Sequence, residues 1–178
     1  LINFRFQFLG PEVFLNWQFW VSLAATSIII TMLIFEAYFD LTYMLLPDFS
    51  SIILWLCSLI LWGLKVFGSG HIIFENWIAM AMAGGFLLTL HLITRGKGMG
   101  MGDVIYALFM GFLLGYEKLV VAFYIAFIGG AVVGLILMLL RKVNKKQPIP
   151  FGPFLIAGTI IAWWFGEKIW ILVTGMIL

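Results

Sequence analysis

Long apolar runs dominate this chain and constrain its fold more than any other feature. About six runs can be drawn, most of them near the roughly 20 residues that a helix needs to cross a hydrocarbon core of about 30 Å. They cover residues 17–39, 49–67, 77–94, 103–116, 119–140 and 151 onward. The strict polar alternation of barrel strands is missing, and backbone groups in lipid have to be paired within their own segment. The sequence therefore predicts an all-α, polytopic membrane protein, a bundle of about six transmembrane helices.

The two ends of the chain leave alternatives open. The last run contains Gly166-Glu167-Lys168, so it forms either one long helix or a helix followed by a short re-entrant tail. Residues 1–178 are expected to form a single membrane domain. Because residue 1 is Leu and polar residues interrupt the first apolar stretch, the chain is also interpreted as a fragment that lacks an N-terminal segment.

Charge and cysteine content exclude several classes of protein. Only 10% of the residues are charged, against roughly 25% in soluble domains, so a soluble enzyme is not expected. The net charge of +2 is too balanced for a nucleic-acid-binding surface. Cys57 is the single cysteine and is predicted to be a buried packing residue. His71 and His91 lack the partners of a metal-binding motif, so we expect no metal and no cofactor.

The basic residues predict an orientation in the membrane. Six of the ten Lys and Arg residues lie in the loops after the third and fifth runs: Arg95, Lys97, Arg141, Lys142, Lys145 and Lys146. The other four are dispersed on the opposite side: Arg5, Lys65, Lys118 and Lys168. The positive-inside rule then places the N-terminus outside and the loops after the first, third and fifth runs in the cytoplasm.

Three aspartates are expected on that same cytoplasmic face. Asp40 ends the first run, Asp48 precedes the second, and Asp103 begins the fourth. Acids at membrane depth are costly and usually functional or paired. An Asp at a helix start is also an ordinary N-terminal cap, which explains Asp103 when it is taken alone. Two carboxylates brought together can act as base toward water and as acid toward a carbonyl or amine, which is aspartic-protease chemistry.

Two further features surround these acids. Gly100 and Gly102 alternate with methionines just before Asp103, and such bare backbone would let an extended peptide approach and pair with the loop. Glu36 precedes Asp40 by four residues, on the same helical face and about one turn deeper. It is either a proton relay or supporting partner of Asp40, or a paired structural acid.

Three segments resemble the type IV prepilin peptidase family, membrane aspartyl proteases of the GxGD class. They are residues 40–48, which end in Leu46-Pro47-Asp48, then Gly100-Met101-Gly102-Asp103, then Ile149-Pro150-Phe151-Gly152-Pro153-Phe154. The resemblance implies that Asp40 and Asp103 are the catalytic aspartates and that Gly100 and Gly102 shape the loop. It also implies that Asp48 is a motif acid outside the catalytic pair and that Pro150 and Gly152 belong to a loop-shaping or substrate-binding segment.

The same resemblance implies a substrate and a location. The substrate is a type IV prepilin or pseudopilin precursor, whose basic leader is cut at the cytoplasmic face of the prokaryotic inner membrane. The protein is then a multi-pass protein in contact with membrane lipid, and its oligomeric state is left open. Larger family members carry a four-cysteine domain associated with N-methylation. With Cys57 as its single cysteine, this chain is not expected to be a methyltransferase.

Other interpretations compete with this one. Presenilin and signal-peptide peptidase also use a GxGD aspartate, but their Pro-Ala-Leu motif is missing here. A small proton- or cation-coupled transporter would use Glu36, Asp40 and Asp103 as a polar path, although these acids cluster at one face instead of the midplane. A catalytically idle membrane scaffold is the third alternative.

Overall fold

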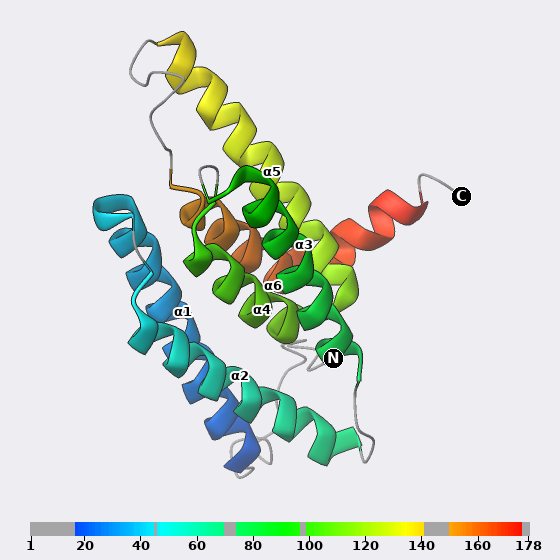
Figure 1. The fold of residues 1–178 in the computed structure, drawn as a ribbon. Helices are drawn as coiled ribbons and strands as arrows, with labels where there is room; N and C mark the ends of the chain where they lie inside the picture. Colours follow the sequence, from blue (N-terminus) through cyan, green and yellow to red (C-terminus); the bar gives the residue numbers. More distant parts are fainter. Residues whose placement is uncertain (1–16, 45, 70–73, 97–98, 141–149, 176–178) are drawn as a thin grey trace.

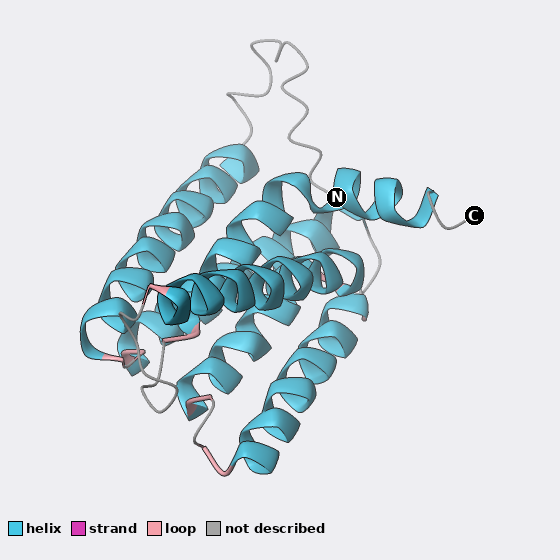
Figure 2. Cartoon of the chain, turned by 90° about the horizontal axis from the view of Figure 1, so that it is seen from above, coloured by secondary structure: helices cyan, strands magenta, loops and turns pink. Residues whose placement is uncertain are grey.

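The described part of the chain is built from helices. The computed structural model describes all residues except 1–16, 45, 70–73, 97–98, 141–149 and 176–178. The helices are α1 (Trp17–Tyr43), α2 (Asp48–Ser69), α3 (Glu75–Thr94), α4 (Met101–Leu114), α5 (Tyr116–Leu139) and α6 (Gly152–Gly175). No strand occurs within these described ranges, as Figure 2 shows. Each predicted apolar run forms one helix, so the all-α fold is confirmed.

Five of these helices are long and apolar enough to cross a membrane, namely all but α4. The chain is therefore a multi-pass membrane protein. Helix α4 has 14 residues. At about 1.5 Å per residue it spans about 21 Å, which is less than a hydrocarbon core of about 30 Å.

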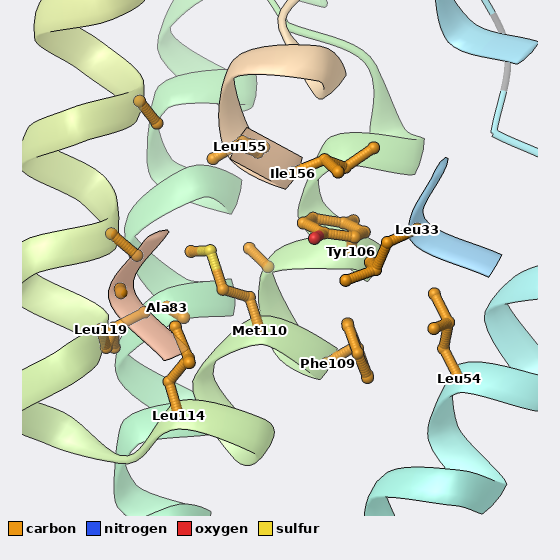
Figure 3. Packing of buried hydrophobic residues seen from close by; sticks show 14 of the residues in the cluster. Leu33, Leu54, Ala83, Tyr106, Phe109, Met110, Leu114, Leu119, Leu155 and Ile156 are labelled. Atoms are coloured by element: carbon orange, nitrogen blue, oxygen red, sulfur yellow. The ribbon is translucent and has the colours of Figure 1, made fainter. Parts of the chain in front are cut away.

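Helices that follow each other in the sequence pack as pairs, and α4 also contacts helices of the other two pairs. α1 packs against α2, α3 against α4, and α5 against α6, while α1 also contacts α6 and α2 also contacts α4 (Figure 1). Figure 3 shows Tyr106 and Phe109 of α4 facing Leu33 of α1 and Leu54 of α2. The shortest helix is thus also the centre of the bundle.

Close backbone contact fixes one end of the pair formed by α3 and α4. A Cβ added to Gly111 would lie 2.8 Å from the carbonyl carbon of Ala79, so the two backbones touch there. Nearby, the side-chain amide of Asn76 donates a hydrogen bond to the carbonyl oxygen of Phe112, at 2.6 Å. The beginning of α3 is therefore held beside the end of α4.

Some helix boundaries differ from the predicted ones. α1 continues beyond Asp40 to Tyr43, and the Phe39 and Tyr43 rings stack at 4.6 Å between centroids. α6 passes through Gly166-Glu167-Lys168 without a break, so the last apolar run is one long helix. Cys57 is buried and unbridged, which confirms its predicted packing role.

Candidate active site

Asp40 lies in the last turn of α1, with 6% of its surface exposed. Its carboxylate rests on Gly152, the first residue of α6, whose backbone N–H interacts with it. A Cβ at position 152 would lie 3.0 Å from the Asp40 Cγ and closer still to Oδ2. A side chain at position 152 would therefore force this carboxylate to move. Asp40 Oδ2 is buried and accepts no hydrogen bond from the described part of the chain.

Asp103 lies in the first turn of α4, with 8% of its surface exposed. Its Oδ2 accepts a hydrogen bond from the backbone N–H of Gly100, at 3.0 Å. The predicted capping role is therefore confirmed, and this bond fixes the orientation of the side chain. The Asp103 and Asp40 carboxylates interact electrostatically, so the fold brings together two acids that are far apart in the sequence.

Neither glycine before Asp103 has a left-handed backbone, and of the two only Gly102 is short of space, since a Cβ at Gly100 would meet its neighbours at an ordinary 3.6 Å or more. Gly100 has φ −72° and ψ 159°, an extended conformation that any residue adopts. Within the described residues, the glycines with positive φ are Gly96 and Gly115, so Gly102 is not among them. A Cβ on Gly102 would lie 3.3 Å from the Leu46 side chain. Gly102 thus allows the turn between α1 and α2 to approach the start of α4.

The three sequence segments therefore meet at one end of the bundle (Figure 1). Leu46 of the first segment packs on Gly102 of the second, and Asp40 of the first packs against Gly152 of the third. Pro150 is half-buried just before α6. Asp48 is the first residue of α2.

The start of α4 lies deeper in the bundle than the end of α3. The ring nitrogen Nδ1 of His91 lies 2.8 Å from the carbonyl oxygen of Met99 and bonds to it, so the loop folds back along the last turn of α3. Arg95 and Gly96 make the turn with φ of 52° and 72°. α3 has 20 residues and α4 has 14, a difference of six residues or about 9 Å of helix. Asp103 consequently lies inside the bundle and not at its rim.

His91 thus holds the loop. Within the described residues, no three His, Cys, Asp or Glu side chains are placed to hold a metal ion. The other predicted histidine, His71, and the loop residues Lys97 and Gly98 lie outside the described residues.

The sequence predicted Glu36 one turn deeper than Asp40, but sequence reasoning missed the hydroxyl groups that form a polar layer at that depth. Glu36 is fully buried and accepts hydrogen bonds from the hydroxyls of Ser50 at 2.8 Å and Ser51 at 3.3 Å. The Tyr106 hydroxyl donates to Thr159 Oγ1 at 3.0 Å. The helical spacing that placed Glu36 beneath Asp40 would also have suggested Tyr106, which follows Asp103 by three residues.

The fold and the site together define a polytopic helical membrane protein that buries two interacting aspartates at one end of its bundle. A sequence model of the type IV leader peptidase family matches residues 27–135, which include both aspartates and both loop glycines. This chain belongs to the type IV leader peptidase family. The match favours the prepilin peptidase family over the presenilin-like and transporter alternatives.

Curated relatives agree with this assignment. A prepilin leader peptidase/N-methyltransferase of Bacillus subtilis is 31% identical over 148 residues, which cover 80% of this chain and 56% of the relative. A protein of the same name from Aeromonas salmonicida is 35% identical over 158 residues, covering 84% and 52%. Another from Legionella pneumophila is 30% identical over 162 residues, covering 89% and 56%. The chain spans about half the length of these relatives. No solved structure matches it.

Proposed function

We propose that this protein is a membrane-embedded aspartic endopeptidase that removes the basic leader from type IV prepilin or pseudopilin precursors, with Asp40 and Asp103 as its catalytic residues. One observation carries the proposal: two buried aspartates from α1 and α4 interact electrostatically at one end of the bundle. Asp103 is oriented by Gly100 and Asp40 by its contact with Gly152. Membership of the leader peptidase family supports the assignment.

The chemistry requires one proton shared by the two carboxyl groups. The deprotonated carboxylate removes a proton from water, whose oxygen then attacks the carbonyl carbon of the scissile peptide bond. The protonated carboxyl donates to the carbonyl oxygen. When the C–N bond breaks, a proton passes to the leaving amine, and the products are a carboxylate and a free amino terminus. Asp40 Oδ2 is buried and accepts no hydrogen bond from the described residues, so it is an unused acceptor for the water that the reaction has to bring in.

The surroundings of Asp103 suit a peptide in extended conformation. Gly100 is exposed and has an extended backbone, so a peptide can approach that backbone without meeting a side chain. A substrate segment that pairs with this loop would present its peptide bond beside Asp103. The relatives are named for prepilin leader peptidase activity, and a prepilin joins a basic leader to a hydrophobic helix, so its cleavage site would lie at the depth of this loop.

The direct test is cleavage of a synthetic prepilin. The purified protein is incubated in detergent micelles with a precursor that carries a basic leader, a glycine and a hydrophobic helix, and the products are identified by mass spectrometry. We expect two fragments separated after the glycine. An intact precursor after prolonged incubation, with a folded enzyme in the same sample, would contradict the proposal. We expect cleavage without S-adenosylmethionine.

The proposal also places the active site on the cytoplasmic side of the prokaryotic inner membrane. The support is the charge distribution, since Lys145 belongs to the basic stretch that precedes α6 in the sequence and Asp40 contacts the first residue of α6, whereas Lys65 and Lys118 lie near the opposite helix ends. Cysteines introduced at these three positions on a Cys57→Ala background should react with an impermeant maleimide in intact cells only at 65 and 118. Labelling of Lys145→Cys from outside would show that the protein has the opposite orientation in the membrane.

A further inference from the structure

Glu36 is the buried acid that the proposed mechanism does not use. Its exposed fraction is 0%, and Oε2 has no hydrogen-bond partner within the described part of the chain. Burying an acid at this depth costs free energy, and acids buried in membrane proteins are usually paired or functional. Glu36 also interacts electrostatically with Asp40, one turn above it on α1, and with Tyr106 of α4. The residue therefore lies directly beneath the proposed catalytic pair.

The Glu36 carboxyl joins α1 to the first turn of α2. Oε1 accepts hydrogen bonds from the Ser50 and Ser51 hydroxyls, at 2.8 and 3.3 Å. The same hydroxyls lie 2.8 and 3.4 Å from the carbonyl oxygen of Pro47. Ser50 has 0% exposure. This buried network thus fixes the position of the turn that contains Leu46 and Pro47 relative to α1.

The turn that contains Leu46 and Pro47 also contacts the loop that orients Asp103. Leu46 packs on Gly102, where even a single added carbon would lie 3.3 Å from its side chain. Gly102 directly precedes Asp103, whose carboxylate is held by the Gly100 N–H at 3.0 Å. A shift of the Leu46 turn is therefore transmitted to the start of α4. The path runs from the helix of one aspartate to the loop of the other.

We propose that Glu36 is a positioning residue of the aspartate pair, which acts through the Ser50 and Ser51 hydroxyls and through Leu46 on the loop that carries Asp103. The inference rests on the proposed peptidase function. It assigns to Glu36 a hydrogen-bond-accepting oxygen as the functional group. Gln offers an accepting amide oxygen at the same position, whereas Ala offers none.

The first test compares three variants in the prepilin cleavage assay, with kcat and KM measured separately. Glu36→Gln should retain kcat within about threefold, whereas Glu36→Ala should lower kcat by about tenfold or more with little change in KM, because small misplacements of reacting groups are expensive. Thr31→Ala is the matched control on α1, since Thr31 is exposed and its hydroxyl bonds the carbonyl of Ser27 on the same helix. It should cleave like wild type.

The second test establishes the route from Glu36 to the loop. Ser50→Ala with Ser51→Ala should lower kcat by a similar factor, and adding Glu36→Ala should cost little more, because the three side chains form one network. This arm also decides the matter if Glu36→Ala does not fold. Thermal unfolding in detergent accompanies every variant.

Several results would overturn the inference while wild-type cleavage leaves the proposed function intact. Unchanged kcat in Glu36→Ala would remove any positioning role. Equal losses in Glu36→Gln and Glu36→Ala would show that the acid proton or charge matters and not the accepting oxygen. Additive losses in the combined variant would show that Glu36 does not act through the serines. Loss of cleavage by the wild-type protein itself would instead count against the proposed function.

Discussion

The contact between Gly152 and Asp40 gives the sharpest quantitative prediction. In Gly152→Ala the new methyl group would lie 3.0 Å from the Asp40 Cγ, and closer to Oδ2, which is shorter than real contacts allow. The colliding atoms form the tip of a short side chain, so the strain is relieved by rotating the carboxyl group. An off-rotamer side chain costs about 0.5–1.5 kcal/mol, and replacing Gly by Ala at the first residue of a helix offsets part of this, by less than the about 1 kcal/mol gained in a helix interior. Stability should therefore change by less than about 1 kcal/mol.

Activity should respond far more than stability. A displacement of about 1 Å in a reacting group can cost about 100-fold in rate, which corresponds to about 2.7 kcal/mol in the activation barrier. We expect kcat for prepilin cleavage to fall by about that factor in Gly152→Ala, with thermal unfolding in detergent nearly unchanged. Gly129→Ala on α5 is the matched control, because its methyl group would meet Phe154 at an ordinary 4.0 Å. Wild-type kcat in Gly152→Ala would refute the reasoning, as would an equal loss in the control.

Two further predictions concern the acids and the loop. Asp40→Asn and Asp103→Asn should each abolish cleavage while the protein stays folded, since either change removes the base or the acid, whereas Asp48→Asn should keep at least partial activity; product formation by Asp103→Asn would contradict the assignment. Gly102→Val should lower cleavage at least about tenfold more than Met101→Leu, because added carbons would push on Leu46 and displace the loop. Equal rates for these two variants, measured by mass spectrometry, would show that the open space at Gly102 is incidental.

The helices were predictable because their apolar runs are long. The end of α1 was not predictable. Asp40 carries a charge and therefore suggested the end of the first span, yet α1 continues to Tyr43. The helix tolerates Asp40 because its carboxylate is buried against Gly152, more than a hundred residues away in the sequence. A local pattern contains no information about such a contact.

The site was predictable in its residues but not in its supports. Spacing and topology indicated that Asp40 and Asp103 share one face, and the structure brings their carboxylates into interaction. The bond between His91 and Met99 could not be derived, since it depends on how the glycine loop folds back along α3. The hydroxyls of Ser50 and Ser51 were equally hidden, because serines near a helix start are ordinary caps until a buried acid is found opposite them.

The short length of α4 makes this protein sensitive to the thickness of its surroundings. Helices that are longer than the hydrocarbon layer tilt, and bilayers thin or thicken around mismatched segments at a modest cost per Å. α4 is about 9 Å shorter than α3 and cannot adjust by tilting, since it lies at the centre of the bundle. Lipids with short chains bring the aqueous boundary nearer to Asp103, and lipids with long chains move it away. For the peptidase that we propose, we therefore expect the supply of the water that hydrolysis consumes to depend on the composition of the membrane.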